Sequence, residues 1–345
     1  MRGRQIGTAL VAMAGAMLLP AGRPALAQQQ QVVVNCEVEL DWCEALKARF
    51  EATTGIKAAM TRKSDGETIA QLRAEASNPR VDVVHAVDTA ATRQLAEEGL
   101  VEAYQSPKLA ELQDWAVRVA EQNKYFQMPL YTGVIGYGYN SELLAKKNLP
   151  EPKCWADLAN PAYKGEVQMA DPTTSGTAYT TIVTLLQLMG EEKGFAFLAA
   201  LHKNVNQYTR SGSAGIKAAA RGETTIGVAF LHDSVAQTVQ GFPVKTVAPC
   251  EGTGFEVATV AIVKGARNRE NAMKWVDWAL SPDAQDVAIA VNKFQLPSNK
   301  SAKVHPQAPR PENVKLLNYD LYKYASDETR AKMLERFEEI RKLPK

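Results

Sequence analysis

The residues whose types and spacing could best hold a ligand form a run within ADPTTSGTAYT, positions 170–180. The run comprises Thr173, Thr174, Ser175, Gly176 and Thr177, and an apolar, helix-compatible segment follows it to Gly190. The first amides of a helix lack intrahelical acceptors, and the helix dipole is positive there, so such an end favours an anion. Capping of the helix by serine or threonine explains one or two of the hydroxyls but not the whole run. We predict that this stretch binds an anionic group, such as a phosphate.

Two further loops carry hydrogen-bond donors just before predicted helices. In TRKSDGET, Ser64 and Gly66 open a helix and are expected to face the same anion from the opposite side, with Arg62 and Lys63 as alternative donors. In TRSGSAG, Ser211 belongs to a similar loop. The alternative for each is a helix cap with no role in binding.

Three residues could serve the other end of a ligand. His232 and Asp233 follow a predicted strand, and Glu256 begins a later one. Carboxylates repel phosphate but accept hydrogen bonds from hydroxyl or ammonium groups. Together with the donor-rich loops, they predict a ligand that is anionic at one end and hydroxylated or cationic at the other.

An enzyme is the competing interpretation. Asp233 and Glu256 could form the carboxylate pair of a glycosidase. However, the sequence has no Gly-x-Ser-x-Gly elbow, no His-Glu-x-x-His and no Walker loop. We therefore expect a binding protein, with no cofactor and no resident metal.

The elements that must position these residues alternate between strands and helices. Strands are predicted over 32–38, 56–63 and 80–87, with helices over 43–55, 66–78 and 91–100. This alternation predicts an α/β fold with a mostly parallel sheet, in which ligands bind beyond the carboxyl ends of the strands.

Two extended segments, near 130–140 and 250–262, predict paired hinge strands between two lobes, and a cleft between lobes is a natural ligand site. The expected domains are a first lobe over 28–135, a second lobe over 136–257, and a return to the first lobe with C-terminal helices over 258–345.

The N-terminus is typical of a cleavable signal peptide. Arg2 and Arg4 precede an apolar segment, and Ala25-Leu26-Ala27 is an A-x-A cleavage site, so residues 1–27 are the predicted signal peptide. Its removal takes away Arg2, Arg4 and Arg23 and no acid, which lowers the net charge from +2 to −1. A protein with this charge has no basic field to attract nucleic acid. We expect a monomer in the periplasm.

The four cysteines form an even set, which in an oxidising compartment favours two disulfides. Three connectivities are open, and we prefer Cys36 with Cys43 and Cys154 with Cys250. The spacing of Cys36 and Cys43 is wider than that of a zinc knuckle, and no histidine is near them.

Several segments of the chain form a recognisable set, namely FEATTGIKAAMTRKSDGET, DPTTSGTAYT, GSAGIKAAARGE, LHDSVAQ, SPDAQDVA and FQLPSNKSA. On these segments the sequence resembles the extracellular solute-binding proteins of ABC importers, and the resemblance covers nearly all of the mature chain. Its branch includes ferric-ion, phosphonate and hexose-phosphate binders. The resemblance implies the two-lobed type II periplasmic binding fold and an inner-membrane permease as partner.

Within this branch the residues favour a phosphorylated organic solute. Ferric binders carry two adjacent tyrosines where this chain has His232 and Asp233, whereas LHD and GTGFE resemble the sugar-binding segments of hexose-phosphate binders. Ferric-ion and phosphonate or phosphate binding remain the alternatives. The chain also departs from its relatives after the third strand, where His85 and Asp88 stand in place of small residues. Both are candidate ligand-binding residues, and His85 is alternatively a helix cap.

Overall fold

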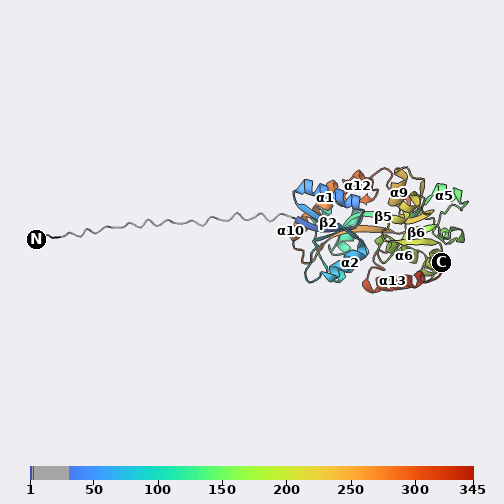
Figure 1. Cartoon of the computed structure of the whole chain (residues 1–345), viewed down its shortest axis with the longest axis horizontal. Helices are drawn as coiled ribbons and strands as arrows, with labels where there is room; N and C mark the ends of the chain where they lie inside the picture. Colours follow the sequence, from blue (N-terminus) through green and yellow to red (C-terminus); the bar gives the residue numbers. More distant parts are fainter. Residues whose placement is uncertain (2, 4–30) are drawn as a thin grey trace.

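The computed structural model describes residues 31–345, together with residues 1 and 3 (Figure 1). The predicted signal peptide and its cleavage site lie almost wholly outside this described part. Among the described residues, no helix is both long and apolar enough to cross a membrane.

The first lobe alternates strands and helices, as predicted. Its elements are β1 (Gln31–Cys36), α1 (Leu40–Thr54), β2 (Lys57–Arg62), α2 (Asp65–Ala74), β3 (Val83–Asp88), α3 (Thr89–Glu97), β4 (Val101–Glu102), the 3-10 turn Leu109–Glu111 and α4 (Asp114–Gln122). β1 lies between β2 and β3 and pairs with both in parallel. The carboxyl ends of these three strands therefore meet at one edge of the sheet.

Two long strands connect the lobes. β5 (Met128–Asn140) and β10 (Phe255–Val263) pair antiparallel, from Met128 with Val260 to Val134 with Phe255. From Ile135 onward β5 pairs instead with β8 (Ile226–Phe230) and β9 (Val244–Val247). The strand order β2-β1-β3-β10-β5-β8-β6-β7 therefore runs through both lobes. This arrangement confirms the predicted α/β, two-lobed fold with paired hinge strands. The sheet is mixed, however, and not mostly parallel as predicted, because β5 and β10 pair antiparallel with all their neighbours.

The second lobe repeats the alternation of the first. Its remaining elements are α5 (Ser141–Lys146), the 3-10 turns Ala156–Ala159 and Pro161–Tyr163, β6 (Val167–Ala170), α6 (Gly176–Met189), α7 (Glu191–His202), β7 (Val205–Thr209), α8 (Ala214–Ala220) and α9 (Leu231–Val239). β6 pairs in parallel with β7 and β8, and α6 leaves the carboxyl end of β6. The hydroxyl-rich run thus lies at the edge of the sheet where ligands are expected.

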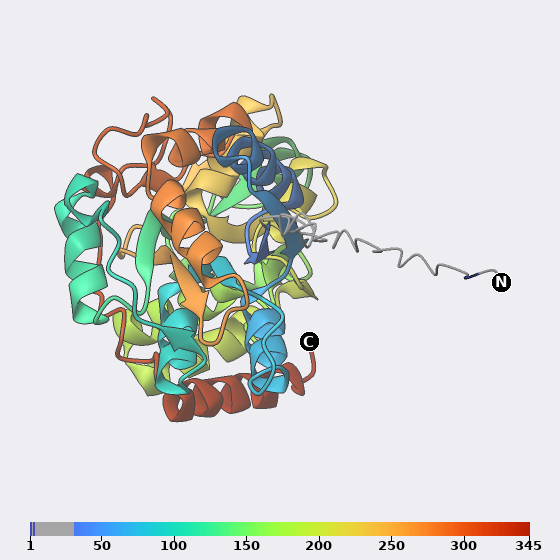
Figure 2. The same ribbon diagram turned by 90° about the vertical axis from the view of Figure 1, so that its left-hand side faces the viewer.

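The chain after β10 contributes to both lobes. It forms α10 (Arg269–Ala279), α11 (Pro282–Gln285), α12 (Val287–Ala290), β11 (Leu296–Pro297), the 3-10 turn Pro311–Asn313 and α13 (Asp327–Arg341). Trp275 of α10 packs in the first core with Phe50, whereas Met333 and Phe337 of α13 belong to the second core. α13 contacts α7 and runs along one end of the molecule (Figure 2). α13 therefore packs on the second lobe. The sequence interpretation had placed it in the first lobe, with the whole of 258–345.

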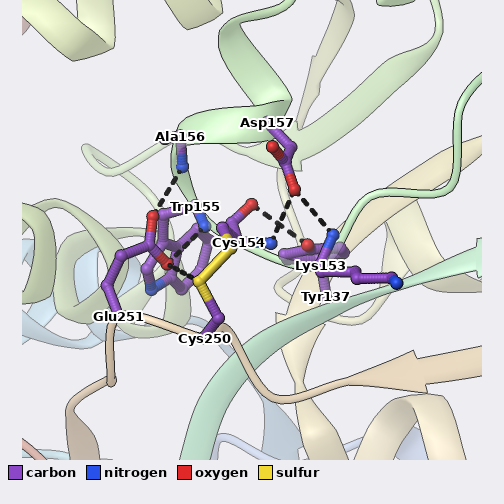
Figure 3. Close-up of a disulfide and its surroundings, with 8 residues drawn as sticks. All are labelled: Tyr137, Lys153, Cys154, Trp155, Ala156, Asp157, Cys250 and Glu251. Carbon is purple, nitrogen blue, oxygen red and sulfur yellow. Dashed lines mark hydrogen bonds between the residues drawn. A yellow bond between two sulfur atoms is a disulfide. The ribbon is translucent and has the colours of Figure 1, made fainter.

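Both preferred disulfides are present, Cys36–Cys43 and Cys154–Cys250. The second joins segments 96 residues apart. Figure 3 shows that Glu251, next to Cys250, accepts hydrogen bonds from the amides of Trp155 and Ala156, at 2.8 and 2.9 Å. These contacts connect the loop before β10 to the loop after α5.

Candidate functional site

A cavity with an empty volume of about 620 Å³ lies between the two lobes, at the carboxyl ends of their strands. The first lobe contributes Glu37, Val38, Glu39, Arg62, Ser64, Asp65, Ala86 and Asp88, and the second contributes Thr174–Thr177, Arg210–Ser213, Phe230, His232 and Asp233. Tyr131 on β5, Glu256 on β10 and Gln295 complete the wall. Both hinge strands thus place a side chain in the cavity.

The structure brings together ten of the thirteen residues predicted to bind the ligand. Those that line the cavity are Ser64, Asp88, Thr174, Ser175, Gly176, Thr177, Ser211, His232, Asp233 and Glu256. Gly66, His85 and Thr173 do not line it.

The run before α6 divides between capping and the cavity. Asp171 Oδ1 accepts hydrogen bonds from the amide and the hydroxyl of Thr173, at 2.9 and 2.6 Å, so Thr173 stabilises the turn. Ser175 is the N-cap of α6 and accepts from the Ala178 amide. The Thr177 hydroxyl lies against Gly212, where a Cβ atom would collide with it. Gly176 and Thr177 thus present the start of a 14-residue helix to the cavity.

The start of α2 contributes less than predicted. The Ser64 hydroxyl donates to Glu67 Oε2 at 2.9 Å, and the Ser64 amide donates to the same oxygen at 3.0 Å. A Cβ on Gly66 would lie 2.7 Å from the backbone oxygen of Thr173. Gly66 therefore allows a close approach of the two lobes and does not itself line the cavity.

His85 lies behind the cavity, which corrects its prediction as a ligand-binding residue. Its Nδ1 is 3.3 Å from Nε1 of Trp275, and the two rings meet edge to face. Burial lowers the pKa of His85 to about 3, so it is neutral. Its neighbour Ala86 lines the cavity with a positive φ of 64°, next to a shift in the pairing of β3 with β10. This irregularity accounts for the side that His85 faces.

The predicted acceptors lie at the second-lobe and hinge side of the cavity. His232 stacks on Phe230, and its Nε2 is 3.8 Å from Asp233 Oδ1. Burial lowers the pKa of His232 to about 3, whereas burial and the nearby Glu39 raise the pKa of Asp233 to about 7. Burial, with Asp88 and Asp65, raises the pKa of Glu256 well above its ordinary value. The histidine is thus neutral, and the acids resist ionisation.

Sequence reasoning missed several acids of this site. Glu37 and Glu39 follow β1, and Asp65 is the neighbour of Ser64 at the start of α2. Their signal was their place directly after a strand or before a helix, and charge alone did not distinguish them from solvated residues. Arg62, considered as an alternative donor, does line the cavity.

Glu39 differs from the other acids because it is paired with cations. It accepts from Ser213 at 3.0 Å and from Lys217 at 3.4 Å, both in the second lobe, and Lys293 lies 3.6 Å away. Burial alone would raise its pKa, but Lys293 and Lys217 outweigh that effect and lower it to about 2. The exposed ion pair of Arg210 with Glu67 also joins the lobes. The described lobes are therefore in contact, as in a closed cleft.

Phenolate oxygens are ligands of ferric ion, and the C-terminal segment carries Tyr319, Tyr322 and Tyr324. None of the three lines this cavity. Asn123 donates to the Tyr322 hydroxyl at 2.7 Å, and the Tyr324 hydroxyl donates to Glu191 at 3.1 Å. The hydroxyls of Tyr322 and Tyr324 thus make hydrogen bonds outside the cavity.

We predict that Asp88→Asn stabilises the ligand-free protein at pH 8 but not at pH 5. Asp88 is 7% exposed, and burial with the nearby Asp65 raises its pKa to about 7. The folded state holds this proton more tightly than the unfolded state, so ionisation of Asp88 lowers stability as pH rises from about 4 to 7. Asparagine removes the charge and still caps α3 by accepting from the Ala90 amide.

The expected gain at pH 8 is about 2–4 kcal/mol in the free energy of unfolding, which urea titrations at the two pH values would measure. A gain of equal size at pH 5 would mean that the charge of Asp88 is not the cause.

A family model described as bacterial extracellular solute-binding protein matches residues 78–323. The chain belongs to this family. A protein of Haemophilus influenzae described as uncharacterized is 42% identical to this solute-binding protein over 317 residues, which cover 91% of this chain and 92% of that one. Membership implies a small-molecule solute, an ABC permease as partner and a periplasmic location.

Two solved structures of periplasmic binding proteins are similar to this solute-binding protein. The first is AfuA from Actinobacillus pleuropneumoniae with exogenous fructose-6-phosphate bound, at 38% identity and a TM-score of 0.88, covering 92% of this chain and 100% of that one. The second is P5PA, at 33% identity and a TM-score of 0.87, covering 91% and 100%. Family and neighbours are binding proteins rather than enzymes.

Proposed function

We propose that the protein captures a small phosphorylated organic solute, such as a hexose phosphate, between its lobes and delivers it to the permease of an ABC importer. The observation that carries the proposal is that the first turn of α6, with Gly176 and Thr177, lines the polar cavity between the lobes. The similarity to AfuA, a structure with fructose-6-phosphate bound, supports the same class of solute.

The phosphate is proposed to bind at the start of α6. Unpaired amides and the positive end of the helix dipole stabilise an anion there. Thr177 of α6 and Ser211 of the loop before α8 add hydroxyl donors from the second lobe, and Arg62 adds a guanidinium from the first. The Nε of Arg62 donates to the Val38 backbone oxygen at 3.3 Å, which fixes the side chain at the cavity wall.

The organic part of the solute is proposed to bind His232, Asp233 and Glu256. A neutral histidine both donates and accepts, and carboxyl groups accept from hydroxyls. These residues come from α9 and β10, so they would contact the solute where the second lobe meets the hinge. A solute that binds both lobes then favours the closed state over an open one. The closed state is the form that the permease would recognise.

Thr177→Val is expected to weaken binding of fructose 6-phosphate by about 10-fold or more. Valine has nearly the same shape as threonine, so the change removes only the hydroxyl. A hydrogen bond to a charged group contributes about 1.5–3 kcal/mol. The control is Thr181→Val on the same helix, because the Thr181 hydroxyl donates at 2.8 Å to the Thr177 backbone oxygen within the helix. Isothermal titration of both variants tests the proposal, and equal affinities for the two would contradict the phosphate position.

A further inference from the structure

We infer that the solute carries a protonated amine in addition to its phosphate. The inference rests on the proposed function and narrows the class of solute from phosphate esters to aminated phosphate esters. It comes from the charges of the cavity wall, where carboxyl groups outnumber the cations that could neutralise them.

Six acids line the cavity, against two arginines. The acids are Glu37, Glu39, Asp65, Asp88, Asp233 and Glu256, and the arginines are Arg62 and Arg210. Arg210 is already paired with Glu67, and Glu39 is paired with Lys217 and Lys293. Five acids of the wall therefore remain without a paired cation. Arg62 is the one arginine of this wall that has no ion pair with a described residue, so a single cation faces five acids.

Glu256 is the acid that most requires a partner. Its side chain is more than nine-tenths buried, with 8% exposure, and it lines the cavity. Within the described part of the chain, its carboxylate has no ion pair and no hydrogen bond. The titratable groups that act on it are Asp65 from α2, Asp88 from β3, Asp233 from α9, Tyr131 from β5 and Tyr319 from the C-terminal segment, and none is a cation.

Glu37 gives independent support. Both of its carboxylate oxygens are buried, and the described side chains that act on them by hydrogen bonding are Asp65 and Thr68, neither of which carries a positive charge. Burial and the nearby Asp65 raise its pKa well above the ordinary value, against a weaker opposing effect of Arg62. Buried carboxylates without a paired cation are strongly unfavourable, so a ligand cation would relieve this group as well.

The acids also lie close to the proposed phosphate position. A Cβ on Gly176 would collide with Asp65 Oδ2 and would lie 3.3 Å from Asp88 Cβ. The cation that acts on Asp88 is Arg330 of α13, whose guanidinium stacks on the Tyr179 ring at 3.9 Å. A phosphate at the start of α6 therefore adjoins two carboxyl groups. An ammonium on the same solute would be attracted both by these carboxyl groups and by the phosphate.

An ammonium suits this wall better than a hydroxyl. It supplies three donors and a full positive charge, whereas a sugar hydroxyl supplies one donor and no charge. Charge-assisted hydrogen bonds to carboxylates are roughly twice as strong as neutral ones.

The test compares two solutes that differ in one group, glucosamine 6-phosphate and glucose 6-phosphate, by isothermal titration at pH 6.5. Fructose 6-phosphate is titrated in the same series. We expect glucosamine 6-phosphate to bind at least 10-fold more tightly than glucose 6-phosphate. In Glu256→Gln this ratio should fall to less than about 3-fold, whereas Glu121→Gln, on an exposed face of α4, should leave it unchanged. Should Glu256→Gln fail to fold, the ratio in the wild-type protein and its pH dependence still decide.

The ratio should also rise between pH 5.5 and 7.0. Asp88 and Asp233, whose pKa burial raises to about 7, begin to lose their protons toward the upper end of this range, while an amine with a pKa of about 7.7–8.0 stays charged. Titration of the phosphate, with a pKa near 6, affects both sugars equally and cancels in the ratio.

The outcomes separate the two claims. Equal affinities, or tighter binding of glucose 6-phosphate, with clear binding of fructose 6-phosphate would overturn the amine inference alone. No binding of any of the three phosphates would overturn the proposed function and the inference with it.

Discussion

Replacing Gly66 by alanine is expected to weaken solute binding by about 10- to 100-fold while stabilising the ligand-free protein. Gly66 lies in the first turn of α2, where a Cβ atom would be 2.7 Å from the Thr173 backbone oxygen across the cleft. Both lobes would have to separate slightly, because the obstacle is backbone rather than a flexible side chain. Overpacking of this kind costs about 1–3 kcal/mol, and here it acts only in the closed state.

The same substitution favours the fold itself. Alanine in a helix is about 0.5–1 kcal/mol more favourable than glycine. In this variant, the solute affinity measured by isothermal titration should therefore fall, while the free energy of unfolding measured with urea should rise. Unchanged affinity for fructose 6-phosphate would show that the lobes need not approach this closely, and a loss of stability would show that the contact is not confined to the closed form.

Removing the Cys154–Cys250 disulfide is expected to lower the free energy of unfolding by about 4–5 kcal/mol. The bond closes a loop of 96 residues, and in the chain-entropy model longer loops give greater stabilisation. The loop spans much of the second lobe, including β6 to β9. A double serine variant measured by urea unfolding tests this value.

The matched control is the double serine variant of Cys36 and Cys43. These residues are seven positions apart, so the same model gives a loss of only about 2–3 kcal/mol. If the short loop proved to stabilise as much as the long one, chain entropy would not be the main origin of the effect.

The sequence predicts the fold well because its signals are local and repeated. Alternating strands and helices, together with the extended segments near 130–140 and 250–262, were enough to indicate two lobes and paired hinge strands. The destination of α13 was not predictable in this way. Its docking depends on which core Met333 and Phe337 enter, and amphipathic spacing identifies a buried face but not its partner.

The site was predicted in outline and missed in detail, for physical reasons. The run at Thr173 to Thr177 has one composition, yet Thr173 caps a turn while Thr177 faces the cavity, and only the path of the chain distinguishes them. His85 was misplaced because strand alternation is interrupted beside Ala86.

The excess of acids emerges only in three dimensions. Glu37, Asp65, Asp88 and Glu256 are far apart in the chain, and the order of β1, β2, β3 and β10 brings them to one edge of the sheet.

The most direct test of the central claim is a thermal-shift measurement on refolded, ligand-stripped protein lacking residues 1–27. The panel would contain fructose 6-phosphate, fructose, inorganic phosphate and ferric ion, because a ligand that binds only the folded state raises the melting temperature. We predict an increase of several degrees with fructose 6-phosphate at saturating concentration and none with fructose or ferric ion. An increase with ferric ion alone would contradict the account and would assign the protein to metal transport.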